Sequence, residues 1–197
     1  ALMLPLICEQ IFTSFMGTVD SMMVSNVSEA AISAVSLVDS INILVIQAFY
    51  ALASGGAIVC ANYLGQKRRD QAERSANQLL FIIFAISLAV LAVCQLFRAP
   101  LLRLVFGSVE QEVMDAAMVY FFYTSLSFPF IALFDSGSAV FRAQNNSRLP
   151  MAITVSTNLM NIAGNALLIW GFHLGVAGAA VSTLLSRIAA ALLVLLF

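Results

Sequence analysis

The chain has 197 residues, of which 61% are hydrophobic and only 10% are charged. A soluble globular domain carries roughly 25% charged residues, so the composition indicates an integral membrane protein. The net charge of −1 argues against a nucleic-acid partner, and because the sequence contains no nucleotide-binding, GxSxG or HExxH motif, it predicts neither an enzyme nor a cofactor.

Six stretches are apolar enough and long enough to provide the ~20 helical residues that cross a hydrocarbon core. They are residues 3–24, 33–62, 75–97, 114–140, 150–171 and 175–197. The connector at 98–112 looks amphipathic, so we expect it to lie on the membrane surface. The predicted fold is therefore an all-α membrane protein, a six-transmembrane-helix bundle. Both ends fall in apolar runs, so we expect a piece of a longer protein.

Basic residues are unevenly distributed between the loops. The second and fourth loops hold six of them: Lys67, Arg68, Arg69, Arg74, Arg142 and Arg148. The other three loops hold only Arg98 and Arg103. Cytoplasmic loops carry an excess of Lys and Arg, so we expect a multi-pass protein of the cytoplasmic membrane with a cytoplasmic N-terminus.

The first span contains two acidic residues, Glu9 and Asp20. A helix turns by about 100° per residue, which places both on one face, roughly 16 Å apart along the axis. Burying an ionisable group in hydrocarbon is costly, and such a residue marks a functional site by default. We therefore expect both to face a protein interior or cavity. Pro5 removes a backbone donor and should bend this helix.

The fifth span carries three carboxamides, Asn158, Asn161 and Asn165, on one helix face. Their oxygens are suitable ligands for a hard cation such as Na⁺. The same face suits a hydrogen-bonded seam with a neighbouring helix, worth about 0.6–2 kcal/mol per bond. Taken alone, this pattern favours the seam over the cation site.

Depth in the membrane adds further candidates. Asp20, Asn161 and Asn165 fall in the outer halves of their spans, as do Tyr120 in the fourth and Thr183 in the sixth. Five oxygen-bearing side chains from four helices can thus meet at a similar depth. This predicts a site for one Na⁺ or one proton, with the two competing for Asp20.

Three further charged residues lie within the spans. Asp39 is in the second, Asp135 in the fourth and Arg187 in the sixth. Asp135, Glu9 and Arg187 fall toward the inner half, which permits an inner ion pair, and for Arg187 we favour structural pairing over transport chemistry. Asp39 is a candidate for the mouth of a cavity.

Short motifs occur along essentially the whole chain. They are Pro5-x3-Glu9, the Val-Asp-Ser-Met-Met-Val-Ser run at 19–25, Ser-Gly-Gly at 54–56, Asn-Tyr-Leu-Gly at 62–65, the loop at 142–150, Asn161-x3-Asn165, Trp-Gly at 170–171 and the Gly-rich run at 175–183. No single motif is specific, but in order and spacing the set resembles that of the multidrug and toxic compound extrusion (MATE) transporters.

The resemblance implies one lobe of a twelve-helix transporter, the N-terminal one, with a C-terminal lobe of the same chain and the lipid bilayer as its partners. It implies export of small organic cations or drugs in exchange for Na⁺ or H⁺ by alternating access. It also implies an N-lobe cation site at Asp20, Tyr120, Asn161, Asn165 and Thr183, with Asp20 and the Asn and Thr side chains as the Na⁺ ligands. Some members carry Asp where this chain has Asn165, which leaves the coupling ion open.

Two alternatives remain. A flippase for lipid-linked sugars would need several cationic residues in its cavity, whereas Arg187 is the only basic residue inside the predicted spans. A non-transport membrane scaffold would use Asp20 and the asparagine face for packing, and it would tolerate Asp20→Asn.

Overall fold

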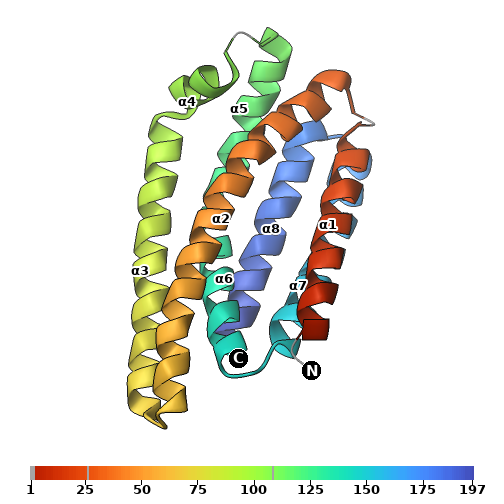
Figure 1. The fold of residues 1–197 in the computed structure, drawn as a ribbon. Helices are drawn as coiled ribbons and strands as arrows, with labels where there is room; N and C mark the ends of the chain where they lie inside the picture. Colours follow the sequence, from red (N-terminus) through yellow and green to blue (C-terminus); the bar gives the residue numbers. More distant parts are fainter. Residues whose placement is uncertain (1–2, 26, 108) are drawn as a thin grey trace.

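The computed structural model describes residues 3–25, 27–107 and 109–197, with all side chains except those at positions 3–6, 8–10, 13, 16 and 20. All regular structure in these ranges is helical, and the helices form one elongated bundle (Figure 1). The long segments, in chain order, are α1 (Met3–Ser25), α2 (Glu29–Gly65), α3 (Arg69–Leu96), the pair α5 (Gln111–Leu126) and α6 (Phe128–Ala143), α7 (Arg148–Asn165) continued by the π-helix η1 (Ala166–Gly171), and α8 (Gly175–Leu196).

These segments correspond one to one to the six predicted spans. Among the described residues, α2, α3, α7 with η1, and α8 are long and apolar enough to cross a membrane, and the α5–α6 pair makes a fifth span. Helix α1 has 23 residues, more than the ~20 that a crossing requires. The prediction of an all-α, multi-pass membrane bundle is confirmed.

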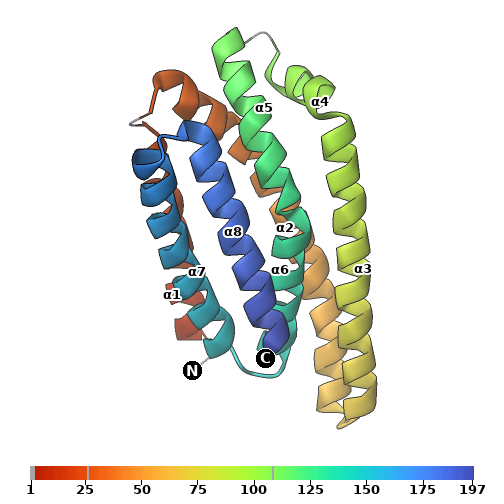
Figure 2. The ribbon, with the colours of Figure 1, turned by 180° about the vertical axis from the view of Figure 1, so that it is seen from behind.

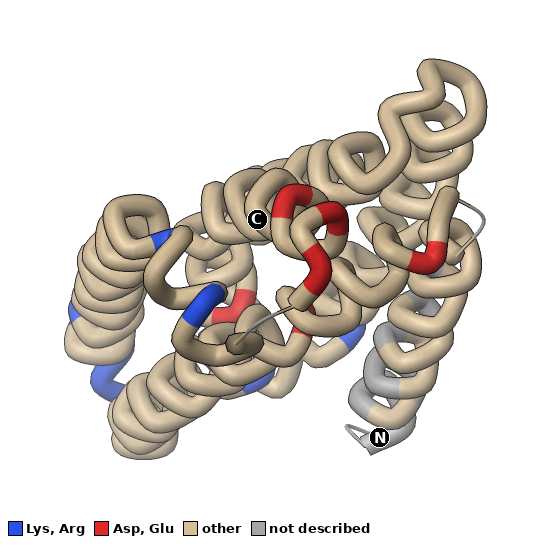
Figure 3. The backbone as a smooth tube through the Cα atoms, turned by 90° about the horizontal axis from the view of Figure 1, so that it is seen from above, with Lys and Arg blue, Asp and Glu red and all other residues tan. Residues whose placement is uncertain are grey.

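The loops divide between the two ends of the bundle as the topology requires. The turns after α2 and α6 lie at the end that holds the N-terminus, and the short helix α4 (Arg98–Phe106) lies at the other (Figure 1). We call the first the basic end, defined by Lys67, Arg68, Arg69, Arg74, Arg142 and Arg148. Acidic residues gather at the opposite end, where α5 begins (Figure 3).

Helices α2 and α8 pack on the α5–α6 pair, with α3 beside α2, α7 beside α8, and α1 along α7 (Figure 2). Phe49 of α2, Phe121 of α5 and Phe128 of α6 are fully buried where these helices meet. The Phe49 and Phe128 rings make an edge contact with centroids 6.2 Å apart. A side chain at Gly56 would collide with Leu79, so this glycine lets α2 and α3 approach closely.

The start of α2 follows from local capping. The Ser28 hydroxyl oxygen accepts a 3.0 Å hydrogen bond from the Ala31 backbone N–H, and Glu29 places a negative charge in the first turn. Both features satisfy the exposed amides at a helix N-terminus. Cap chemistry therefore determines where the chain turns back after α1.

The fourth span differs from the single helix predicted over 114–140. It breaks at Ser127, and α5 and α6 meet at a bend of 43°. Pro129 has no N–H to donate to the preceding turn, and the Ser127 backbone N–H tightens the break by donating to the Thr124 carbonyl at 3.1 Å. Proline chemistry is the physical reason for the correction.

A second departure from regular helix lies in the fifth span. Residues Ala166–Gly171 form a π-helix directly after Asn165, which the sequence did not predict. The backbone of Leu168 in this segment lies 3.0 Å from the position that a Cβ on Gly178 would occupy, so α8 begins in close contact with it. π-Helical turns often occur at functional sites, and this one adjoins the asparagines of the candidate site.

Candidate cation site

A buried polar seam joins α7 to α8. The Asn161 amide Nδ2 lies 3.4 Å from each of three hydroxyl oxygens, those of Ser182, Thr183 and Ser186. The Asn165 amide donates to the Asn161 Oδ1, also at 3.4 Å, and both asparagines are buried, Asn165 being only 1% exposed. Polar groups this deep in an apolar bundle require such partners.

Close packing at Gly164 makes this seam possible. A Cβ at that position would collide with the Ser182 hydroxyl, which donates a 2.9 Å hydrogen bond to the Asn161 backbone carbonyl. The absence of a side chain therefore lets α8 approach α7 closely enough for Ser182 to reach the backbone of α7.

Replacing Gly164 by Ala is expected to displace Ser182 and to lower the free energy of unfolding by about 1 kcal/mol, the order of one interhelical hydrogen bond. Thermal unfolding of the intact protein in detergent measures this loss. Gly55→Ala is the matched control, because a Cβ at Gly55 meets nothing within 4 Å. Equal stability of the two variants would contradict the packing argument.

A second polar cluster links α2 to α5. The Asp39 Oδ1 accepts hydrogen bonds from the Tyr120 hydroxyl at 3.3 Å and from the Asn42 amide at 3.2 Å. Asn42 is buried, and its Oδ1 has no hydrogen-bond partner among the described residues. The half-buried Asp39 carboxylate thus lies in a polar environment within the membrane-spanning part of α2.

Arg187 of α8 connects this cluster to the bend in the fourth span. Its guanidinium donates a 2.7 Å hydrogen bond to the Ser127 hydroxyl at the α5–α6 break. Its charge also acts on the Asp39 carboxylate. Because Arg187 lies one turn beyond Thr183 on α8, a single helix carries residues of both polar clusters.

The structure brings together three of the five residues predicted for the cation site. Asn161, Asn165 and Thr183 share hydrogen bonds, and the Tyr120 hydroxyl donates a hydrogen bond to Asp39 of α2. The Asp20 side chain lies outside the described residues, although its helix α1 packs along α7.

The side chains of Glu9 and Pro5 also lie outside the described residues, so their roles stay predictions. Asp135 is buried in α6, and its ion pair with Arg187 remains a prediction. Asp39, a candidate from the sequence for the mouth of a cavity, accepts a hydrogen bond from Tyr120 and so belongs to the Tyr120 cluster. Membership in that cluster depends on contacts between α2 and α5, which residue spacing does not reveal.

Sequence reasoning missed several residues that the two clusters use: Asn42, Ser127, Ser182 and Ser186. The three-residue and four-residue spacings of Asp39 with Asn42 and of Ser182 with Ser186 are signals for a shared helix face. Isolated serines are common in membrane helices, however, where each can bond to its own backbone, so these signals are weak.

The two clusters supply oxygen atoms rather than sulfur or imidazole. Among the described side chains, no three His, Cys, Asp or Glu residues are grouped as metal ligands. Amide and hydroxyl oxygens are the ligand types that hard cations prefer. These asparagine and hydroxyl side chains are therefore compatible with both interpretations drawn from the sequence. One is hydrogen bonding between helices, and the other is a cation-binding surface that still needs a carboxylate.

Fold and site together define a multi-pass helical membrane protein with buried polar networks inside the bundle. The family model MatE matches residues 5–167, and the chain belongs to this family of transporters. The chain is 32% identical to an uncharacterized transporter, YisQ of Bacillus subtilis, over 93% of its own length. It is 28% identical to a probable multidrug resistance protein, NorM of Thermotoga maritima, over 94% of its length.

Solved structures agree on the fold. An outward-facing multidrug resistance MATE transporter of the MOP superfamily superposes with a TM-score of 0.92 at 20% identity over 98% of the chain. A MOP superfamily transporter from Pyrococcus furiosus, for which a binding pocket of reversed polarity was described, gives 0.91 at 20% identity over 98% of the chain. The chain covers 42% of each of these structures and 41% of YisQ, so it corresponds to one lobe.

Proposed function

We propose that the chain is the N-terminal lobe of a secondary antiporter that exports small organic cations in exchange for Na⁺ or H⁺. Membership of the MatE family and the likeness to a probable multidrug resistance protein support this proposal. The observation that carries it furthest is the buried Asn161–Asn165–Thr183 seam, because neutral oxygens deep in a membrane bundle suit an exchangeable cation.

In this proposal Asp20 of α1 supplies the negative charge that the seam lacks. A carboxylate beside amide and hydroxyl oxygens binds either Na⁺ or a proton, since each neutralises the charge. Tyr120 extends the site to Asp39 through its hydroxyl. Cation binding favours one arrangement of α1, with Pro5 as its bend, and the resulting change in the cavity expels the drug. The coupling is limited by the difference in cation affinity between the two states.

The basic end of the bundle faces the cytoplasm in this proposal, because Lys and Arg concentrate in cytoplasmic loops. The cation site then lies in the outer half of the membrane, where an inward gradient of Na⁺ or H⁺ loads it. The C-terminal lobe of the intact protein completes the drug cavity.

Efflux of a fluorescent organic cation from vesicles containing the intact protein tests the proposal. An imposed Na⁺ or H⁺ gradient is expected to drive efflux, and the gradient that does so identifies the coupling ion. Collapse of that gradient with an ionophore serves as the control and should stop efflux. Efflux that ignores both gradients would contradict antiport.

A further inference from the structure

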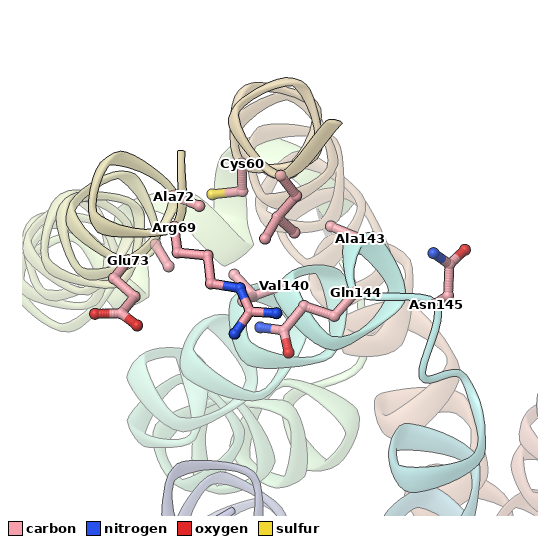
Figure 4. Close-up of a pocket in the computed structure, with 10 residues that line it drawn as sticks. Cys60, Arg69, Ala72, Glu73, Val140, Ala143, Gln144 and Asn145 are labelled. Atoms are coloured by element: carbon pink, nitrogen blue, oxygen red, sulfur yellow. The ribbon is translucent and has the colours of Figure 1, made fainter. Parts of the chain in front are cut away.

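A cleft of about 550 Å³ opens at the basic end of the bundle (Figure 4), and none of the residues that line it belongs to the candidate cation site. It lies between the last turns of α2 and α6 and the first turns of α3. Leu64, Ala76 and Val140 form part of an apolar wall, while Arg69 and Gln144 provide polar groups at the mouth. A volume of this size is in the usual range for small-molecule sites.

Arg69 is the distinctive residue of this cleft. It is the first residue of α3, and its guanidinium points across the cleft toward the Gln144 carboxamide (Figure 4). Its guanidinium makes no hydrogen bond or ion pair with the rest of the chain that the structure describes. A guanidinium offers five donors in a planar fork that matches the oxygens of a phosphate, so the cleft presents a set of unused donors.

The surroundings reinforce the positive charge. Lys67 and Arg68 precede Arg69 in the turn between α2 and α3, and Arg74 follows on α3. Arg142 is engaged elsewhere, with its guanidinium 5.8 Å from the centre of the Tyr50 ring. Glu73 lines the cleft with the opposite charge, but its carboxylate points away from Arg69 and Gln144 (Figure 4).

We propose that this cleft binds the phosphate headgroup of an anionic phospholipid from the membrane leaflet at the basic end. Arg69 binds the phosphate oxygens, the Gln144 amide donates a further hydrogen bond, and the apolar wall receives the glycerol and the first acyl carbons. Basic pockets between membrane helices are the general means of recognising acidic headgroups. The proposal is independent of the coupling ion, because no residue of the cation site lines this cleft.

An amphiphile fits the cleft better than a free anion does. The walls combine an apolar part from α2, α3 and α6 with a charged mouth, and the mouth lies where the helices leave the membrane. A free phosphate would use the donors but leave the apolar wall exposed to water. The occupant is therefore expected to depend on its acyl chains as well as on its charge.

Native mass spectrometry of the intact protein, titrated with phosphatidylglycerol or phosphatidylcholine, tests the proposal. The unaltered protein is expected to retain phosphatidylglycerol preferentially, and Arg69→Gln should weaken that retention about fivefold, the effect of one basic residue at an acidic lipid surface. Glu73→Gln should strengthen it, because an opposing charge is removed. Arg74→Gln is the matched control, since Arg74 lies on the same helix outside the cleft lining.

Three results would overturn the proposal. Equal effects of Arg69→Gln and Arg74→Gln would reduce the binding to a diffuse surface charge. Displacement of the lipid by millimolar inorganic phosphate would assign the cleft to a free anion. Gln144→Ala removes an uncharged donor at an exposed loop position and leaves the charge of the cleft unchanged. Unchanged lipid retention in this variant would contradict the proposed contact between Gln144 and the phosphate.

Discussion

Replacing Asp20 by Asn in the intact protein is expected to abolish gradient-driven efflux while leaving membrane insertion unchanged. The amide has the size of the carboxylate but no charge to bind a cation or to accept a proton. Interactions with a charged group contribute about 1.5–3 kcal/mol, so cation affinity should fall roughly 10- to 100-fold. Dye efflux from vesicles measures the activity, and the amount of protein in the membrane fraction measures insertion.

Asp115→Asn is the control for this experiment. Asp115 is exposed on α5, where its carboxylate accepts a 2.9 Å hydrogen bond from Gln111, so its replacement should leave efflux intact. Undiminished efflux in Asp20→Asn would defeat the assignment of the coupling carboxylate. Such tolerance, together with an absence of any ion-driven efflux in the unaltered protein, would instead support a scaffold whose asparagine face serves packing.

The second large effect is expected at Arg187, whose guanidinium binds the α5–α6 bend and whose charge acts on Asp39. Arg187→Met removes the hydrogen bond to Ser127 and leaves the Asp39 carboxylate without its neighbouring positive charge. Removing one partner of a buried charge pair costs about 3–5 kcal/mol. Both side chains are only half-buried, so we expect a loss at or below the lower end of that range. Chemical unfolding in detergent measures it.

A double-mutant cycle isolates the interaction between the two charges. Asp39→Asn and Arg187→Met together are expected to cost less than the sum of the single variants, by about 1 kcal/mol, as is usual for residues that interact directly. Ser127→Ala removes the hydrogen bond to Arg187 without changing either charge, together with the bond from the Ser127 hydroxyl to the Thr124 carbonyl. Arg103→Met, at an exposed position of α4, controls for the loss of an arginine. Strict additivity of the two losses would show that the charges do not interact.

Local sequence signals account for the gross architecture. Apolar runs of bilayer length located the six spans because every backbone polar group in lipid must be satisfied within a helix. The same signals failed within the fourth span, where Pro129 breaks the helix, and at the π-helix after Asn165. Both irregularities are local departures inside otherwise apolar runs, so averaging over a span conceals them.

The candidate site was only partly accessible to the same reasoning. Helical spacing grouped Asn161 with Asn165, and depth in the membrane added Thr183, which the structure places within hydrogen-bonding distance of Asn161. Depth alone does not say which helices are neighbours. Depth grouped Tyr120 with the asparagines, and it gave no sign that the Tyr120 hydroxyl donates to Asp39 on α2.

The amino-acid sequence by itself determined that this protein is a helical membrane bundle, which of its residues are costly to bury, and which loops are basic, because hydropathy and charge act locally along the chain. Only the tertiary structure decided which costly residues meet. Gly164 admits Ser182 to the backbone of α7, Arg187 reaches the bend at Ser127, and Arg69 points into a cleft formed by three helices. These contacts join residues far apart in the chain, and they arise from the way small and bent positions let the helices pack.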